Sequence, residues 1–400
     1  MMRRIKILLA IIVLAIAGFG VVWALAKTGR AITPGSSATS AAPLNNNSDS
    51  TTATIAFTGD ILMHMDLVRS GYNADAGGYD FTRVFAPVAP YLHQADYAVG
   101  NLETRMAGAE MGYSGYPRFN SPDELASGLK ASGFTMLATA NNHSMDMGWG
   151  GIVHTLDTLD AAGLAHIGTA RSAEERAAPA FVTIKGIRVA FLNYTAETNE
   201  LPVPKSRPYA VNLLQPEKIL ADTSKVRKNG ADVVIAVLHF GEEYEPKPNK
   251  YQRNIARQLL EGGVDAIIGS HPHVVQPIEK ITVQRNGAPY TGVVAFSLGN
   301  FASTQRERYR DAGIILYLTL AKNTHGTVVT GTKYLPVWVQ QGWQRGIHQA
   351  RVLPALPDTD PHSDLPLTVA DEARLRQVWD DTHGQLEREE LGIVAWAGRP

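Results

Sequence analysis

The chain contains no cysteine among its 400 residues, so disulfide bonds, thiolate zinc sites and cysteine nucleophiles are excluded. It also lacks a strong charge of either sign. The net charge of −1 gives no overall attraction to nucleic acid or anionic lipid, and we expect no nucleic-acid partner. Neither absence indicates disorder, because hydrophobic residues make up 44% of the chain and charged residues 19%. Composition therefore indicates a folded globular protein and leaves its function open.

A long uncharged apolar run, Ile7 to Ala26, stands near the N-terminus. About 20 such residues are enough to cross a bilayer as a helix. Three basic residues precede it, so we predict that residues 1–27 form a cytoplasmic tail and a single-pass transmembrane anchor, with the main domain outside the cytoplasm. A cleaved signal peptide is the alternative, because Ala24-Leu25-Ala26 has the small-x-small form of a cleavage site, and it would give a secreted protein. We favour the anchor because signal peptides usually have apolar regions of only ~7–15 residues.

The rest of the sequence divides into three parts. Residues 28–52 are rich in Ser, Thr, Ala, Asn, Gly and Pro and lack apolar periodicity, which predicts a flexible linker. Residues 53–305 alternate short β-type runs with helical stretches, a pattern typical of an α/β domain with helices outside its sheets. Residues 306–400 add strand-like runs, a proline-rich connector and an amphipathic helix, and we expect them to complete the same domain.

The predicted elements of the 53–305 part are short. The strands are Thr54–Thr58, Tyr97–Val99, Thr135–Thr139, Val189–Leu192, Val233–His239, Ala266–Ile268 and Val293–Ser297. The helices are Phe81–His93, Pro122–Ser132, Gly151–Ala162, Pro216–Asn229 and Asn249–Gly262. Farther on, we predict antiparallel strands that complete a second sheet and then a surface helix, over Gly313–Leu320, Thr327–Val339, Ile347–Leu353 and Leu367–Leu391.

Polar side chains suited to metal binding or proton transfer follow these strands at their carboxyl ends. In chain order they are Asp60, His64, Asn101, Glu103, Asn141, Asn142, His143, Asp146, His239, Glu242, Glu243, His271, His273 and Asn300. Ligands of an open α/β sheet collect at that end, so these side chains are expected to converge. Carboxylates, amide oxygens and imidazoles without sulfur suit Mn, Fe, Zn or Mg. About six ligands fit two divalent ions better than one, and a pair of ions can activate water and stabilise an oxyanion.

Each residue also has a structural interpretation. His239 alone could be a hydrogen-bonded core histidine, and Asp60 could cap the following helix. Asn141 and Asn142 could be turn residues, and we expect Asp146 to stabilise the turn before Gly148 rather than to touch substrate. The hypothesis of a metal centre depends on the joint arrangement, which these separate interpretations do not explain.

Several motifs occur in an order that resembles a known family. They are G-D at 59–60, V-G-N-L-E at 99–103, A-N-N-H-S-M-D-M-G at 140–148, H-F-G-E-E-Y at 239–244, G-S-H-P-H-V-V-Q at 269–276 and S-L-G-N-F at 297–301. This pattern resembles the bacterial capsule-synthesis CapA family, which is associated with making or exporting poly-γ-glutamate capsules. An N-terminal membrane anchor is also typical of that family.

The family is in turn similar to the calcineurin-like metallophosphatases, which implies an α/β fold with a β-sandwich flanked by helices. The resemblance implies the following roles, position by position. Asp60 and His273 would bind one divalent metal ion, His239 and His271 would bind the second, Glu103 would bridge both, Asn142 would be a further ligand, and His143 would protonate the leaving group. Candidates for additional or supporting roles are His64, Asn101, Asn141, Asp146, Glu242 and Asn300.

Two departures from the metallophosphatase pattern concern the ligands. Those enzymes commonly carry Asp-x-His at the first strand, whereas the nearest histidine here is His64, four residues after Asp60. The bridging position holds Glu103, which is one methylene longer than the usual aspartate. These changes bear on the spacing and identity of the metals, and they could retune the site toward another ester or an amide.

Two hypotheses of function follow. The first is an outward-facing, metal-dependent hydrolase that acts on an anionic polymer such as poly-γ-glutamate or on a phosphoester. The second is a non-catalytic, metal-containing component of a polymer synthesis and export complex, in which the transmembrane helix docks to partner proteins. Basic residues near the motifs could contact an anionic polymer or simply form a solvated face: Arg105, Arg118, Lys247, Lys250 and Arg253.

Overall fold

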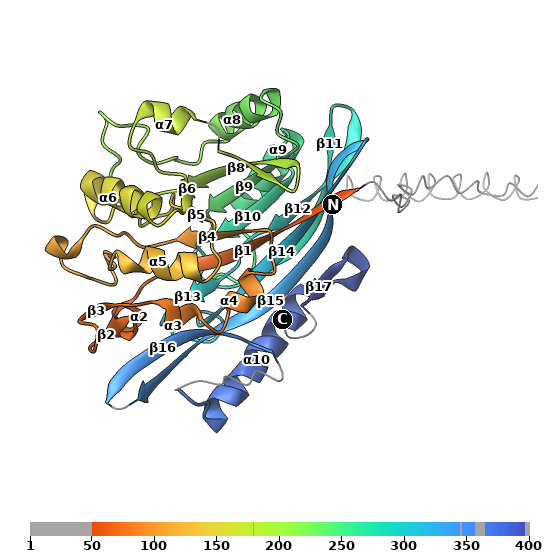
Figure 1. The fold of residues 1–400 in the computed structure, drawn as a ribbon. Coiled ribbons are helices and arrows are strands. Elements are labelled where there is room, and N and C mark those ends of the chain that lie inside the picture. Colours follow the sequence, from red (N-terminus) through yellow and green to blue (C-terminus); the bar gives the residue numbers. More distant parts are fainter. Residues whose placement is uncertain (1–49, 179, 345, 357–364, 397–400) are drawn as a thin grey trace, which may run out of the picture. The chain divides into compact units, whose positions relative to one another are not determined.

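Two β-sheets share one hydrophobic core in the computed structural model, which describes residues 50–178, 180–344, 346–356 and 365–396. The predicted anchor Ile7–Ala26 and nearly all of the 28–52 linker lie outside these residues. Among the residues described, no helix has the length and apolar character needed to cross a bilayer. Figure 1 shows the elements along the chain, and the α/β class predicted from the sequence is confirmed.

The first sheet has the order β16-β15-β14-β1-β4-β5-β6, with β13 paired to β1 and β17 paired to β15. Strands β1, β4, β5 and β6 run parallel, whereas β14, β15 and β16 are antiparallel additions beside β1. The bounds are β1 Thr51–Ile61, β4 Tyr97–Leu102, β5 Met136–Ala138, β6 Ala165–Ile167, β13 Asn300–Ala302, β14 Ala312–Asn323, β15 Gly326–Gln344, β16 Ile347–Pro354 and β17 Ile393–Ala395.

The second sheet has the order β11-β12-β10-β9-β8-β7, and its four inner strands are parallel. The bounds are β7 Phe181–Ile184, β8 Ile187–Thr195, β9 Val233–His239, β10 Ala266–Ser270, β11 Ile278–Arg285 and β12 Ala288–Ala295. The late strands β14 to β16 therefore extend the first sheet, and our prediction that they complete the second sheet is wrong. The edges of the second sheet are formed instead by the antiparallel strands β7 and β11.

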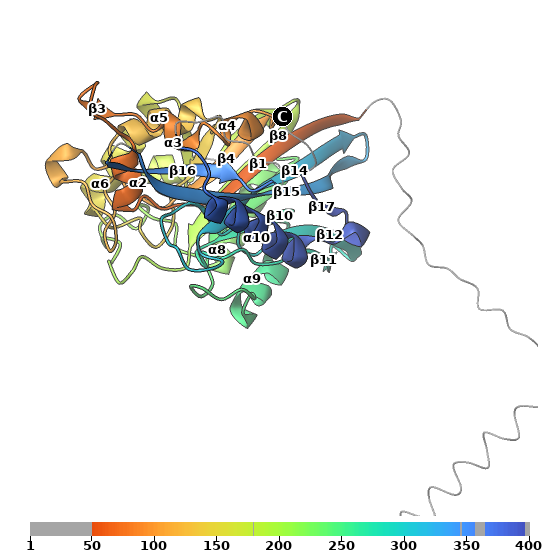
Figure 2. The same cartoon turned by 90° about the horizontal axis from the view of Figure 1, so that it is seen from below.

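Helices cover the outer faces of both sheets, as Figure 2 shows with α5 on one side and α9 on the other. The bounds are α2 Met65–Ser70, α3 Thr82–Phe85, α4 Ala89–Leu92, α5 Glu124–Ala131, α6 Gly148–Ala161, α7 Ala173–Ala177, α8 Pro216–Lys228, α9 Lys250–Glu261 and α10 Val369–Leu386. A short antiparallel pair, β2 Tyr72–Asn73 and β3 Gly78–Tyr79, lies between α2 and α3.

Two predicted helices are shorter in the structure. The predicted helix 81–93 is divided into α3 and α4, because Pro87 has no N–H to continue the helical hydrogen bonds. The predicted helix 367–391 ends at Leu386, where Glu387 takes extended backbone angles. The Glu387 carboxylate accepts hydrogen bonds from the Tyr334 hydroxyl at 2.9 Å and from the Ala395 N–H at 3.2 Å, so it ties this turn to β15 and β17.

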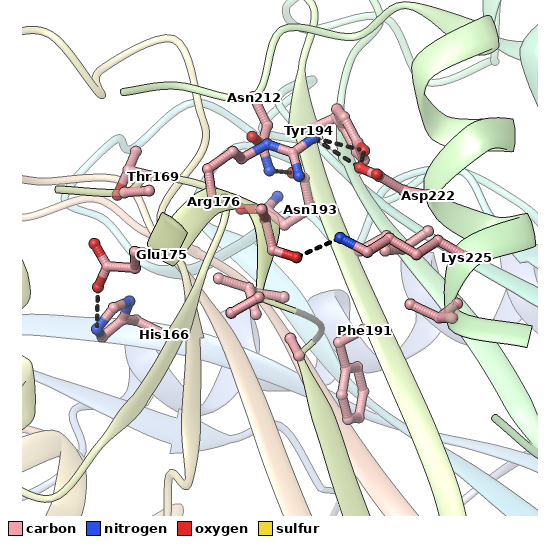
Figure 3. Close-up of a pocket in the computed structure, with 18 residues that line it drawn as sticks. His166, Thr169, Glu175, Arg176, Phe191, Asn193, Tyr194, Asn212, Asp222 and Lys225 are labelled. Carbon is pink, nitrogen blue, oxygen red and sulfur yellow. Dashed lines mark hydrogen bonds and ion pairs between the residues drawn. The ribbon is translucent and has the colours of Figure 1, made fainter. Parts of the chain in front are cut away.

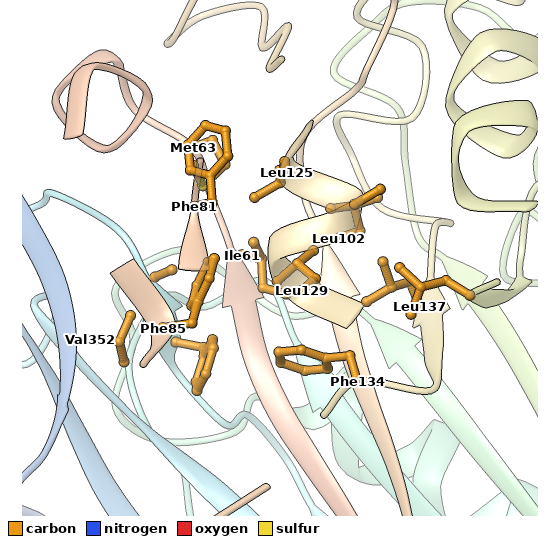
Figure 4. Packing of buried hydrophobic residues seen from close by; sticks show 14 of the residues in the cluster. Ile61, Met63, Phe81, Phe85, Leu102, Leu125, Leu129, Phe134, Leu137 and Val352 are labelled. Carbon is orange, nitrogen blue, oxygen red and sulfur yellow. The ribbon is translucent and has the colours of Figure 1, made fainter. Parts of the chain in front are cut away.

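The core consists of a layer between the sheets and a layer beneath each set of helices. Side chains of β1, such as Ile55 and Phe57, point between the sheets, while Ile61 points toward the helices. Figure 4 shows Ile61 with Leu129 of α5 and Phe134 in the outer layer. Because β1 is buried on both faces, its apolar run is nearly continuous. This burial fixes the carboxyl end of β1, where the polar residues begin.

Candidate metal centre

The predicted ligands follow strands whose carboxyl ends meet at one edge of the two sheets. Asp60 of β1 is in register with Asn101 of β4 and with Asn300 of β13. In the second sheet, His239 of β9 is in register with Ser270 of β10, immediately before His271. Parallel pairing therefore brings segments far apart in the chain together.

A first group consists of Asp60, Glu103 and His273, all buried, whose ligand atoms lie within 4.8 Å of one another. His273 Nδ1 lies 3.1 Å from Asp60 Oδ2, and His273 Nε2 lies 3.9 Å from Glu103 Oε1. Glu103 Oε1 is buried and has no hydrogen-bond partner among the residues described. A buried carboxylate oxygen without a donor is costly unless a cation or a proton satisfies it, so this group fits a divalent ion.

A second group lies beside the first and consists of Asn142, His239 and His271. His239 Nε2 lies 3.0 Å from Asn142 Oδ1 and 3.1 Å from His271 Nδ1. It also lies 3.6 Å from Glu103 Oε1. One nitrogen can donate a single proton, yet three atoms with lone pairs surround it. The geometry therefore also suits a cation, and Glu103 lies between the two groups.

The electrostatics of these groups reflect their burial. Burial, and then the neighbouring Asp60, raise the pKa of Glu103 well above its ordinary value. Burial, and then the other imidazoles, lower the pKa of His239 well below 6.5 and that of His271 to about 4. The imidazoles of His239 and His271 are therefore neutral near pH 7 and keep a lone pair for a metal.

The H-P-H segment has an unusual backbone. His271 has φ of 101° and His273 has φ of 58°, both in the left-handed region that side chains other than glycine rarely adopt. Such conformations cost roughly 1–3 kcal/mol each and persist where the surroundings fix them. Here the strained backbone directs the imidazole of His273 to the first group and that of His271 to the second group.

The tautomer of His273 is set by its neighbours. Its Nδ1 lies 3.1 Å from Asn300 Oδ1 and 3.1 Å from Asp60 Oδ2, and both oxygens are acceptors. The Asn300 amide nitrogen is already engaged, because it donates to the Arg310 carbonyl at 2.7 Å and to Gln305 Oε1 at 3.1 Å. His273 Nδ1 is therefore the protonated nitrogen, and Nε2 faces Glu103 with its lone pair.

His143 and Asp146 form a pair next to the second group. His143 Nδ1 lies 2.8 Å from Asp146 Oδ2, and the same oxygen accepts the Phe119 backbone N–H at 2.7 Å. The Phe119 ring packs edge-on against the imidazole with the ring centroids 4.7 Å apart. The Asp146 carboxylate thus holds His143 and the Phe119 backbone, which differs from the role in the turn before Gly148 that we expected.

The remaining predicted residues have supporting or distant positions. Asn101 donates to Asp60 Oδ1 at 2.8 Å, and Asn141 donates to the Leu102 carbonyl at 2.7 Å, so both amides brace the strand ends. His64 makes no hydrogen bond to the predicted ligands; its Nδ1 lies 3.4 Å from Ser303 Oγ, and burial lowers its pKa to about 4. Glu242 is exposed and accepts from Asn249, so the structure does not bring it to the centre.

The structure also adds a residue that no motif indicated. Asn199 accepts from the Asn142 amide at 3.2 Å, and its own amide nitrogen lies 3.5 Å from both ring nitrogens of His143. Its φ of 47° is left-handed, as asparagine tolerates. It lies in an irregular segment after β8, where the sequence carries no periodic signal.

The basic residues considered as polymer contacts are differently placed. Arg105 is fully buried, with Nη2 donating to the Leu102 carbonyl at 2.7 Å, so it cannot reach a polymer. Arg253 pairs with Glu279 at 3.0 Å. Three of these residues are exposed and form no ion pair with a carboxylate that the structure describes: Arg118, Lys247 and Lys250. This placement agrees with a solvated face.

A separate polar pocket of about 90 Å³ lies beside β8 and α8, and Figure 3 shows its lining. Its charged groups satisfy one another: Arg176 donates to Asp222 at 2.7 Å and to the Tyr194 hydroxyl at 3.1 Å, while Lys225 donates to the Ala177 carbonyl at 2.6 Å. Asn193, which lines it, binds the Ala140 N–H at 2.8 Å and the Val237 carbonyl at 3.0 Å. Asn193 thereby links the segments that precede Asn142 and His239.

The fold and the site together define a protein with a buried centre of carboxylate, amide and imidazole groups at the ends of parallel strands. The bacterial capsule synthesis protein family (PGA_cap) matches residues 54–305. The chain is 32% identical over 279 residues to the PGA biosynthesis protein CapA of Bacillus subtilis (strain 168), with 68% of each chain covered. It is 29% identical over 308 residues to the capsule biosynthesis protein CapA of Bacillus anthracis, with 74% of this chain and 70% of the relative covered. The chain belongs to this capsule synthesis family.

Solved structures show weaker similarity. The NAD nucleotidase of Haemophilus influenzae aligns with a TM-score of 0.47 and 12% identity over 88% of this chain. The chain spans 65% of that nucleotidase, which is less than two thirds of its length. The calcineurin-like phosphoesterase YfkN of Bacillus subtilis aligns with a TM-score of 0.43 and 15% identity, over 83% of this chain and 98% of that structure.

Proposed function

We propose that this protein is a metal-dependent hydrolase of capsule polymer biosynthesis. The observation that carries the proposal is the position of Glu103 Oε1, which is buried, has no hydrogen-bond partner among the described residues, and lies 3.6 Å from His239 and 3.9 Å from His273. A carboxylate between two such groups of ligands is suited to bridge two divalent cations.

The side chains divide between two positions. Asp60 and His273 would hold one cation, and Asn142, His239 and His271 would hold the other, with Glu103 shared. Divalent ions bound there would supply Lewis-acid activation of water and of the group under attack. Mn, Fe, Zn and Mg all accept this set of oxygen and nitrogen donors.

His143 would transfer a proton to the leaving group. Because Asp146 accepts the Nδ1 proton at 2.8 Å, Nε2 is the nitrogen that exchanges protons with substrate. The buried Asp146 carboxylate would stabilise the imidazolium form before transfer, and the edge contact with Phe119 fixes the ring plane. This pair therefore supplies acid catalysis next to the cations.

Our proposal for the substrate class is supported by the relatives, which are named for capsule and PGA biosynthesis. We infer a poly-γ-glutamate amide as the substrate and a phosphoester as the alternative. The N-terminal run Ile7–Ala26 supports attachment to the cytoplasmic membrane, with the centre outside the cytoplasm. Protease treatment of intact cells tests this location, since an outward domain is cleaved and a cytoplasmic one is protected.

The test of the hydrolase uses the purified full-length chain in detergent with Mn²⁺ added. Cleavage of γ-linked oligoglutamate and of generic phosphoesters is measured with the wild type, H143A and D60A, together with the bound metal. We expect H143A to keep metal and lose turnover, and D60A to lose both. The control is H154A, since His154 contacts Asp123 at 2.8 Å in a half-buried position outside the centre. Bound metal without turnover on either substrate class would instead favour the non-catalytic component of an export complex.

A further inference from the structure

Arg310 lies next to the centre and contacts it through the ring of Tyr244. Its guanidinium carbon lies 3.5 Å from the centroid of the Tyr244 ring, and the Tyr244 ring lies 6.0 Å from that of His273. Tyr244 is itself fixed, because its backbone has φ of 68° and its N–H donates to the Pro272 carbonyl at 2.7 Å. The arginine is therefore held against the ring of Tyr244, whose backbone is hydrogen-bonded to the H-P-H segment.

The backbone of Arg310 is tied to the same centre by a second route. Its carbonyl accepts from the Asn300 amide at 2.7 Å, and Asn300 Oδ1 contacts His273 Nδ1 at 3.1 Å. Its N–H donates to the Glu307 carbonyl at 2.9 Å, which closes a turn. Both the backbone and the side chain of Arg310 are thus positioned relative to His273.

The guanidinium N–H groups of Arg310 have no acceptor among the residues described. Two neighbouring arginines differ in this respect: Arg308 pairs with Asp381 at 2.6 Å, and Arg306 donates to Gln341 at 3.1 Å. Stacking on a ring engages the face of a guanidinium and leaves its N–H edge free. Arg310 is half-buried, so it combines restricted motion with an open hydrogen-bonding edge.

We propose that Arg310 is a specificity-determining residue that binds a carboxylate of the substrate next to the bond held at the metal centre. This inference rests on the proposed function and names the feature of the substrate that the site selects. A planar guanidinium matches a carboxylate in a bidentate geometry, and a γ-linked glutamate chain carries one free carboxylate on each residue. Arg310 lies outside residues 54–305, which the family model matches. Selection of the substrate carboxylate would therefore come from the segment that follows residue 305.

The test is titration calorimetry of the full-length, Mn²⁺-loaded protein with γ-linked triglutamate and with its triamide, in which amides replace the three α-carboxylates. We expect R310Q to bind triglutamate about ten-fold or more weakly and to bind the triamide as the wild type does. The matched control R306Q removes an arginine of the same segment and should stay within about two-fold. R310K keeps the charge without the planar fork and should recover only part of the affinity.

Other outcomes would overturn the assignment. One is that R310Q and the wild type bind triglutamate with equal affinity. Another is that R310Q weakens the binding of the triamide as much as that of triglutamate. The third is that the wild type does not bind triglutamate. Metal content and thermal midpoint are measured for every variant, and R310K provides the comparison if R310Q does not fold. If triglutamate binds through Arg310 but is not cleaved, the proposed hydrolase activity is contradicted and the role of Arg310 is retained. Failure of the proposed function can therefore be distinguished from failure of this assignment.

Discussion

Asn300 Oδ1 and His273 Nδ1 lie 3.1 Å apart, and this contact, together with that of Asp60 Oδ2 at the same distance, determines which nitrogen of the imidazole is protonated. The Asn300 amide nitrogen is occupied by the Arg310 carbonyl at 2.7 Å, so its oxygen must face the ring. A residue outside the proposed cation positions thereby orients His273, which we propose as a ligand.

We predict that N300A weakens Mn²⁺ binding by about 10–100-fold, because His273 loses one of the two acceptors that fix its tautomer. Competition with a metal-chelating dye measures the affinity. The matched variant is Q305A, which removes an acceptor of the Asn300 amide nitrogen but leaves the oxygen in place. Q305A should stay within about three-fold of wild type. Equal affinities for N300A and wild type would show that the contact has no influence on the metal.

A second prediction concerns the acid pair. D146N should lower kcat by about 10²-fold with the metal content unchanged, because an amide cannot stabilise the imidazolium of His143. Turnover and elemental analysis are measured on the same samples. D123N serves as the control, since Asp123 contacts His154 at the same 2.8 Å distance but in a half-buried position outside the centre. A similar kcat in D146N and D123N would remove the proton-transfer role.

A third prediction concerns the close approach of strands before Asp60. A Cβ at Gly59 would lie 1.9 Å from the Gly299 carbonyl oxygen, so only glycine fits there. G59A should lower the free energy of unfolding by about 3 kcal/mol and displace Asp60. At Gly150 in α6 a Cβ meets nothing within 4 Å, so G150A should be neutral or stabilise by about 1 kcal/mol. Urea denaturation compares the two variants, and a tolerated G59A would contradict the packing described.

The pH dependence of the metal-free protein follows from its buried imidazoles. Burial lowers the pKa of His64 and of His271 from 6.5 to about 4, and that of His239 well below 6.5. Between these values the unfolded chain binds more protons than the folded chain, so the free energy of unfolding falls as the pH is lowered from 6.5 to 4. The raised pKa of Glu103 acts in the opposite direction, since its contribution is lost as the pH rises. We expect the effect of the three imidazoles on the free energy of unfolding to exceed that of the single carboxyl group.

Denaturation in the presence of a chelator at several pH values measures this slope. It should approach about 1.4 kcal/mol per pH unit for each fully shifted imidazole. H64L removes one such group and should flatten the dependence. A free energy of unfolding that stays constant or rises on acidification through this range would be inconsistent with neutral buried imidazoles.

The sequence allowed the strand ends to be located because parallel strands and their termini leave a local signal. The buried apolar run at Val233–His239 coincides with β9, and the polar residues at the carboxyl ends of β1, β4 and β10 directly follow such runs. The edge strands β7 and β11 were missed, since they are partly exposed and their apolar pattern is weak. We could predict that the ligands lie close together because the carboxyl ends of parallel strands meet at one edge of a sheet.

Residues outside regular elements could not be predicted in the same way. Asn199 and Arg310 reach the centre through loops whose path depends on tertiary contacts, so no periodicity marks them. Arg105 was considered as a surface contact because of its charge, yet it is fully buried beside Glu103. Its position follows from the turn after β4 and not from its residue type.

The most direct test of the metal centre is anomalous diffraction from crystals of the full-length protein grown with MnCl₂. We predict two manganese peaks, one beside Asp60 and His273 and the other beside Asn142, His239 and His271, with Glu103 between them. The absence of an anomalous peak among these side chains, in crystals that hold manganese elsewhere or not at all, would contradict the central claim.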